Sequence, residues 1–248
     1  MVKKRLSNES VLMSSYRNYI QLLLPALLIS LCACSSLEKL QKQTGMRVKK
    51  IKINDLGDEY LEYKGTEFDF FSKERPKKER LKIKYRTFKL KGFDSFNKQS
   101  TVLFAKFKFA RKVNEQFDTL IEELFDKGLQ GESRKSIRQA LRKRSTKKLN
   151  TVKRVSKSYA SLNLSIKVIK EIIIDAKKLV NDSQGVTDKA KKDLLNKPDK
   201  VILTDKLLLE SKRTLKRLTM ILTQSPKLIK SLTKHLKIAD VAEKLKKH

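Results

Sequence analysis

The chain has 248 residues, with 59 Lys and Arg against 27 Asp and Glu, and a formal net charge of +32. Hydrophobic residues make up 39% of the chain, which excludes a wholly disordered protein and suits one domain with a helical core. The positive charge indicates attraction to polyanions. A genome that enriches lysine on exposed faces would give the same excess, since lysine far outnumbers arginine.

The N-terminus combines basic residues with a short apolar run. Basic residues at positions 3–5 precede the apolar residues 22–29, and Ala33 stands directly before Cys34. A basic start, a short apolar core and a small residue before the cleavage point are typical of a secretory signal peptide. The apolar stretch ends at Ala33, well short of the about 20 residues that a membrane-crossing helix needs. We therefore expect residues 1–33 to be a signal peptide.

The residues Leu31-Cys32-Ala33-Cys34 resemble the lipobox of bacterial lipoproteins. The resemblance implies cleavage between Ala33 and Cys34, a diacylglycerol on the Cys34 sulfur and an acyl chain on the new amine. It implies no other cofactor, and it makes the lipid bilayer a partner. The mature chain would then carry no free thiol, because Cys32 leaves with the signal peptide. An ordinary cleaved signal and an uncleaved N-terminus are the alternatives, and Met13 is an alternative start.

Residues 34–46 are expected to form a lipidated tether, and residues 47–94 a small β or irregular segment. Apolar residues alternate with polar ones at residues 48–53 and 81–85. Such period-two alternation beside glycine and proline predicts short strands.

From residue 95 to residue 248 the apolar spacing becomes helical and predicts a mainly α protein, an antiparallel bundle of four amphipathic helices. The first helix is expected to end before Gly128 and Gly131. Its apolar face is Leu103, Phe107, Ala110, Phe117, Ile121 and Leu124. The second helix carries a heptad seam and is expected to end at residues 181–185. Its seam is Val152, Val155, Tyr159, Leu162, Ile166, Ile169, Ile173, Ala176 and Val180.

A minor helical piece at Leu194 and Leu195 is predicted before the last two helices. Thr204 or Asp205 is predicted to cap the third helix, whose apolar face is Leu208, Leu215, Leu218 and Leu222. Pro226 is predicted in the first turn of the fourth helix, which continues through Ile229, Leu232, Leu236 and Ala239. Short breaks between the segments favour packing within one chain over a coiled coil between chains.

Residues 133–170 contain 13 basic residues and no acidic one. Like charges four residues apart destabilise a helix, and a bound polyanion would relieve the repulsion. A solvated charged face is the alternative. Nucleic acid is the less favoured polyanion, because Tyr159 is the sole aromatic residue nearby and stacking platforms are missing. The candidate polyanion-binding residues are Arg134, Lys135, Arg138, Arg142, Lys143, Arg144, Lys147, Lys148, Lys153 and Arg154.

Catalytic chemistry is absent from the sequence. Two histidines and no free thiol in the mature chain give no metal-ligand spacing, and the seven glycines form no phosphate-binding loop. We therefore expect neither a metal nor an enzyme.

The Lys-rich and Ile-rich helical body resembles the surface lipoproteins of spirochaetes. This resemblance implies a non-catalytic binding module at the outer membrane or cell surface rather than at the periplasmic face of the inner membrane. Its expected ligands are an anionic glycan, a lipid or a host protein. One alternative is a periplasmic structural lipoprotein held against its own membrane or cell wall. The other is a cytoplasmic nucleic-acid-binding protein.

Overall fold

Long helices and a two-stranded sheet make up the described part of the chain. The structure is a computed structural model that describes residues 46–57, 83–124, 153–197 and 199–246. The features below belong to the unit Val48–His248, apart from Arg47, which begins the first strand. In chain order, the elements are β1 (Arg47–Lys50), the 3-10 helix η1 (Ile53–Leu56), β2 (Lys84–Thr87), α2 (Lys91–Leu124), α5 (Tyr159–Leu194) and α6 (Lys200–Lys246).

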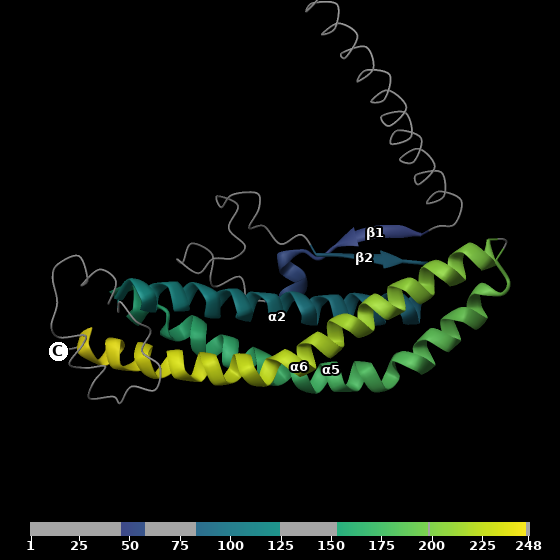
Figure 1. Cartoon of the computed structure of the whole chain (residues 1–248). Coiled ribbons are helices and arrows are strands. Elements are labelled where there is room, and N and C mark those ends of the chain that lie inside the picture. The colour runs from purple at the N-terminus through teal and green to yellow at the C-terminus, as the bar shows by residue number, and fades with distance from the viewer. Residues whose placement is uncertain (1–45, 58–82, 125–152, 198, 247–248) are drawn as a thin grey trace, which may run out of the picture. The chain divides into compact units, whose positions relative to one another are not determined.

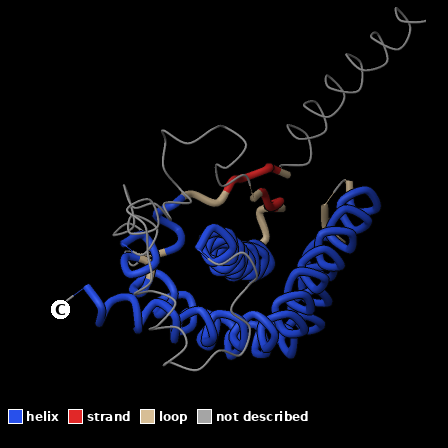
Figure 2. Tube along the Cα trace, turned by 60° about the vertical axis from the view of Figure 1, so that its left-hand side comes forward, coloured by secondary structure: helices blue, strands red, loops and turns tan. Residues whose placement is uncertain are grey.

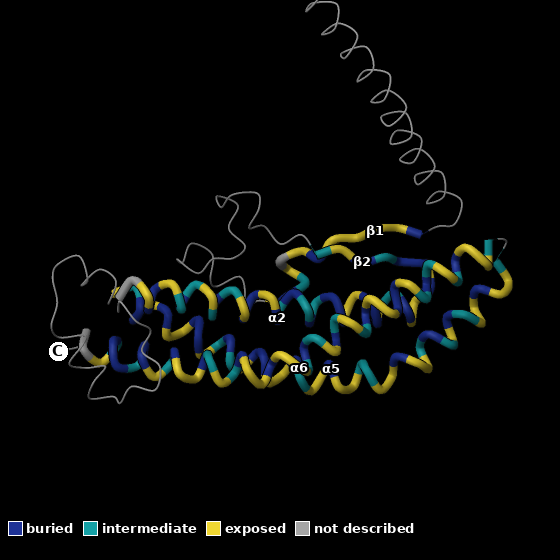
Figure 3. Tube along the Cα trace, in the orientation of Figure 1, coloured by how far each residue is buried: buried dark blue, intermediate teal, exposed yellow. Residues whose placement is uncertain are grey.

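The three helices pack lengthwise on one another, which confirms the predicted mainly α bundle. The helix α2 lies between the strands on one side and the α5–α6 pair on the other (Figures 1 and 2). Buried residues follow the inward faces of all three helices (Figure 3). The predicted apolar face of the first helix is confirmed, because Leu103, Phe107 and Phe117 are all buried in α2.

The predicted short strands are also confirmed. The strands β1 and β2 pair as an antiparallel sheet, and the backbone N–H of Ile51 donates to the carbonyl of Ile83 at 3.0 Å. Tyr85 and Thr87 of β2 are buried. The 3-10 helix η1 follows β1 in the chain, and its Asp55 forms a salt bridge of 2.9 Å with Lys98 of α2. The sheet is therefore fixed to one side of the bundle.

The turn from β2 into α2 is stabilised by Asp94, in the first turn of the helix. Its carboxylate accepts hydrogen bonds from the backbone N–H groups of Phe88 at 2.7 Å and Leu90 at 3.2 Å. Burial raises the pKa of Asp94, and these hydrogen bonds oppose that rise. Lys89, between the two donors, has a φ of 59°. The carboxylate thus fixes a tight connection that sets the direction of β2 against α2.

The helix α6 buries two rows of residues that each repeat every seven positions. One row is Leu207, Thr214, Ile221, Leu228, His235 and Ala242, and the other is Ser211, Leu218, Ser225, Leu232 and Ala239. A sustained seven-residue repeat is the packing pattern of coiled coils. At 47 residues, α6 is about 70 Å long. This seam places one helix along the whole bundle.

Several predicted helix ends are wrong. The helix α5 does not end at residues 181–185 but continues to Leu194, and so includes the first residue of the predicted minor helical piece. The predicted third and fourth helices are one helix, with Thr204, Asp205 and Pro226 inside α6. Within the described ranges, three long helices therefore stand where four were predicted. Gly185 and Pro226 are exposed, so neither interrupts the packed seams, and packing along the helices outweighs their local cost.

The predicted heptad seam of the second helix is half right. Val155, Leu162 and Ala176 are buried as predicted. The second row of the seam lies one residue earlier than predicted, at Ser158, Ser165 and Ile172. Tyr159, at a predicted seam position, is 36% exposed. The small serines are accommodated because each hydroxyl bonds a carbonyl four residues earlier, at 2.9 Å for Ser158 and 2.8 Å for Ser165.

Buried hydroxyls also explain why α5 continues past its predicted end. The Thr187 hydroxyl donates to the carbonyl of Ser183 at 2.7 Å. It also lies 2.9 Å from the Ser211 hydroxyl of α6. Hydroxyl groups that are satisfied inside the helix and across to the next helix can be buried without the cost of an unpaired polar group. Packing against α6 therefore keeps α5 helical through residues 181–185, although their side chains are mostly polar.

Candidate functional site

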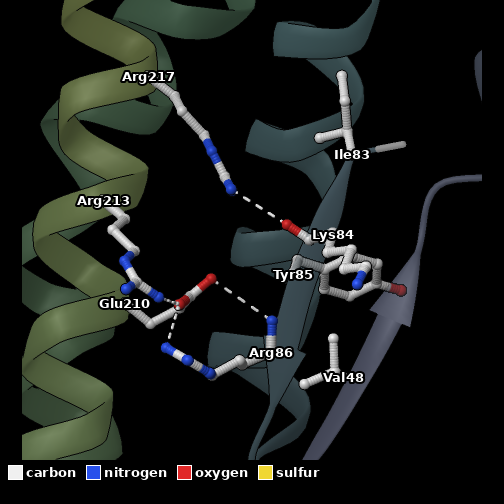
Figure 4. Close-up of a pocket in the computed structure, with 8 residues that line it drawn as sticks. All are labelled: Val48, Ile83, Lys84, Tyr85, Arg86, Glu210, Arg213 and Arg217. Atoms are coloured by element: carbon white, nitrogen blue, oxygen red, sulfur yellow. Dashed lines mark hydrogen bonds and ion pairs between the residues drawn. The ribbon is translucent and has the colours of Figure 1, made fainter. Parts of the chain in front are cut away.

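A hollow of about 530 Å³ lies where β2 faces α6 (Figure 4). It is the strongest concentration of arginine in the described part of the chain. Its polar lining is Lys84, Arg86, Glu210, Arg213 and Arg217, and its apolar edge is Val48, Ile83 and Tyr85. The lining contains four basic residues and one acidic residue, which gives it a net charge of +3. This arrangement suits an anion.

Glu210 is the centre of the site and is only 2% exposed. One carboxylate oxygen lies 3.3 Å from guanidinium nitrogens of both Arg86 and Arg213. The other oxygen accepts from the backbone N–H of Arg86 at 3.4 Å and the amide of Asn97 at 3.5 Å. The buried carboxylate therefore holds two guanidinium groups beside each other, one from β2 and one from α6.

Arg217 lies four residues after Arg213, on the same face of α6. Its guanidinium donates to the Thr101 hydroxyl at 2.9 Å and to the Lys84 carbonyl at 3.1 Å. The Phe104 ring lies 6.0 Å away, within the range of a cation–π contact. These contacts hold Arg217 across the gap between α6 and β2.

Burial lowers the pKa of Arg217, against the opposing effect of Glu210. The neighbouring positive charge of Arg213 adds to the lowering. Arginine nevertheless stays protonated in proteins. The charge of Arg217 is thus only partly compensated, and an anion in the hollow would stabilise it.

A buried hydrogen-bond network supports the hollow from behind. The side-chain amide of Asn97 donates from Nδ2 to the backbone carbonyl of Arg86 at 2.7 Å, and its oxygen Oδ1 accepts from the Thr214 hydroxyl at 2.9 Å. Asn97 and Thr214 are fully buried. The network joins α2, β2 and α6, so the backbone that carries the arginines is fixed before any ligand arrives.

A second polar pair, a buried histidine and a half-exposed carboxylate, lies elsewhere between α2 and α6. His235 donates from Nε2 to Asp118 at 2.9 Å, and its ring contacts Phe117 with the ring centres 4.9 Å apart. Burial lowers the pKa of His235, against the effect of Asp118. Burial also raises the pKa of Asp118, against the effect of His235. Neither residue lines the hollow.

The residues singled out from the sequence are not the ones in the hollow. Cys34 and Ala33 lie outside the described residues. So do Arg134, Lys135, Arg138, Arg142, Lys143, Arg144, Lys147 and Lys148. Lys153 and Arg154 lie in a helical stretch at residues 153–157, where Lys153 is exposed and Arg154 half-buried. Neither lines the hollow.

Sequence reasoning missed the hollow because its cations come from segments far apart in the chain. Arg86 and Glu210 are 124 residues apart. One signal was available: Arg213 and Arg217 are four residues apart and follow Glu210 in a chain that otherwise prefers lysine. Charged residues at that spacing share one face of a helix.

No protein-family model matches the chain, and no curated protein or solved structure is significantly similar to it. Within the described residues, no group of three or more His, Cys, Asp or Glu could hold a metal ion. None of the helices described is both long enough and apolar enough to cross a membrane.

Proposed function

We propose that the chain is a lipid-anchored, exported binding module that holds anionic ligands and catalyses no reaction. The single observation that carries the binding part is the set of three guanidinium groups around one buried carboxylate. Guanidinium forks match the oxygen atoms of phosphate, sulfate and carboxylate groups. The overall charge of +32 favours the same ligands by drawing anions toward the protein.

The anchor rests on the lipobox-like residues that end at Cys34. A single acyl chain gives reversible membrane binding, whereas several chains on one residue hold a protein on the bilayer for its lifetime. The helical body would then work at a membrane surface, at the outer membrane or the cell surface. There it would meet anionic glycans, lipids or host proteins.

Metabolic labelling with a radioactive fatty acid tests the anchor. We expect the wild-type chain to incorporate label and the Cys34→Ala variant to incorporate none. Protease added to intact cells should then digest the labelled protein. A protected labelled protein would support a periplasmic structural role instead, and an unlabelled protein of full length would support the cytoplasmic alternative.

Retention on a heparin column tests polyanion binding by the basic segment. Charge reversal at Arg138, Arg142 and Arg144 should lower the salt concentration that elutes the protein. The matched control reverses three exposed lysines of α6, at positions 227, 230 and 234. Both variants lose the same total charge, so equal shifts would mean that the basic segment is no site and that only net charge matters.

A further inference from the structure

We propose that the hollow between β2 and α6 binds a terminal phosphate group, the dianionic monoester of a small molecule or of a lipid headgroup, through Arg86, Arg213 and Arg217. This inference rests on the binding part of the proposed function and is independent of the anchor.

The geometry gathers three guanidinium groups at one place. Arg86 and Arg213 share one oxygen of Glu210, so they are close neighbours. Arg217 follows Arg213 by about one helical turn and reaches the Lys84 carbonyl. Figure 4 shows both α6 arginines extending toward β2, with Arg86 directed back toward α6. A group placed between the two elements would meet donors from both.

The guanidinium N–H donors of the site outnumber the acceptor oxygens that they bond within the protein. Each guanidinium carries five N–H groups. The side chains of Arg86 and Arg213 each use one nitrogen on Glu210. A tetrahedral phosphate offers three terminal oxygens and suits several forks at once, whereas a carboxylate offers two.

Charge favours a monoester over a diester. The wall of the hollow carries a net charge of +3. A phosphate monoester carries about −1.5 to −2 at pH 7, whereas a diester carries one negative charge. The monoester therefore compensates more of the charge that Glu210 leaves unbalanced.

Size favours a phosphate that is attached to an organic group. The hollow of about 530 Å³ falls in the range of small-molecule sites, roughly 300–1,000 Å³, and exceeds what one ion needs. Val48 and Ile83 supply an apolar edge for the organic part. Glu210 acts as a positioning residue, because it aligns two of the arginines rather than meeting the phosphate.

Isothermal titration calorimetry with glycerol 3-phosphate tests the soluble arm, using the full chain with Cys34→Ala to prevent acylation. We expect saturable binding at pH 7.5. The affinity should fall about tenfold at pH 5, because the second pKa of the phosphate is about 6. Arg217→Gln should weaken binding about tenfold or more, as expected for the loss of a charged hydrogen-bond donor. The control is Arg111→Gln, because Arg111 lies exposed on α2 beside Glu115, outside the hollow.

Vesicle sedimentation tests the lipid arm with the same proteins. Vesicles containing phosphatidic acid, a monoester, are compared with phosphatidylglycerol vesicles, a diester, matched in surface charge. Binding that prefers phosphatidic acid and needs Arg217 identifies a lipid headgroup as the source, and calorimetric binding alone identifies a soluble ester. Circular dichroism must show both variants folded. If Arg217→Gln is unfolded, Arg213→Gln replaces it, because that side chain is 48% exposed, and it should weaken binding to a similar extent.

Several results would overturn the inference: binding in neither arm, equal binding of monoester and diester, or equal effects of Arg217→Gln and Arg111→Gln. The anchor and the heparin result are measured separately. A chain that is acylated and retained on heparin but binds no phosphate monoester would disprove this inference alone. A chain that binds the monoester without acylation would disprove the anchor alone.

Discussion

Replacing Glu210 by Gln removes the one carboxylate that lines the hollow while keeping its shape. The side chain is 2% exposed, and it bonds Arg86, Arg213 and Asn97. The amide that replaces it keeps one acceptor oxygen but no negative charge. Two guanidinium groups would then face each other without compensation, and we expect the folded state to lose stability.

The size of the loss follows from burial and distance. Removing one partner of a fully buried ion pair costs about 3–5 kcal/mol. Here Arg86 and Arg213 are 27% and 48% exposed, so water screens part of the cost. The contacts of 3.3 Å are also longer than the most favourable ones. We therefore expect a loss of about 2 kcal/mol, or about 4–8 °C in melting temperature for a chain of this size.

Urea unfolding followed by circular dichroism measures this loss. The matched control is Glu115→Gln, which removes an exposed carboxylate paired with Arg111 on α2 and should cost no more than about 0.5 kcal/mol. A double variant with Arg213→Gln should cost less than the sum of the two single changes, because the two residues interact. A loss for Glu210→Gln no larger than that of the control would refute the view that the carboxylate organises the hollow.

Three further predictions concern the helices. Gly185→Ala should stabilise the protein by about 0.5–1 kcal/mol in urea unfolding, because Gly185 is exposed inside α5 and an added Cβ meets nothing within 4 Å. A loss of stability would mean that the helix does not continue through this position. Pro226→Ala should raise the urea midpoint, because it restores a backbone hydrogen bond in α6 and adds about 1–3 kcal/mol to the free energy of unfolding. A lower midpoint would contradict an unbroken helix. The urea midpoint should also fall as the pH drops from 7.5 to 5.5. Burial lowers the pKa of His235, so the unfolded chain takes up the proton first, and the stability present above the unfolded pKa of about 6.5 is lost on acidification. Burial raises the pKa of Asp118, so the folded chain takes up that proton first and the titration of Asp118 opposes the fall. His235→Leu should abolish the fall, and an unchanged pH dependence in that variant would contradict it.

The fold class was predictable because the apolar residues carry a helical period. Leu103, Phe107 and Phe117 mark the buried face of α2 without ambiguity, since large side chains at that spacing have one face to bury. The positions that hydrophobicity could not identify are buried serines and threonines, such as Ser165 and Thr187. They are buried because their hydroxyls are satisfied by nearby carbonyls, a property of the folded helix rather than of the residue type.

The candidate site was less predictable than the fold. Arg86 comes from a strand, and Arg213 and Arg217 come from a helix more than 120 residues later, so only the folded chain brings them together. Local propensity also misplaced the helix ends. The polar segment at residues 181–185 and Pro226 weaken a helix locally, but packing along the whole of α6 outweighs that cost.

The alternation of polar and apolar residues along the α6 seam has a consequence for alignment. Sliding α6 by seven residues would bring Ile221 to the place of Thr214, opposite Asn97 of α2, and would separate the Asn97 amide from its hydroxyl partner. The same slip would shift His235 away from Asp118. A uniform leucine seam would tolerate such a slip, whereas buried polar residues at single positions penalise every register but one. The buried polar residues of the seam, rather than its most hydrophobic ones, therefore select one alignment of the three helices.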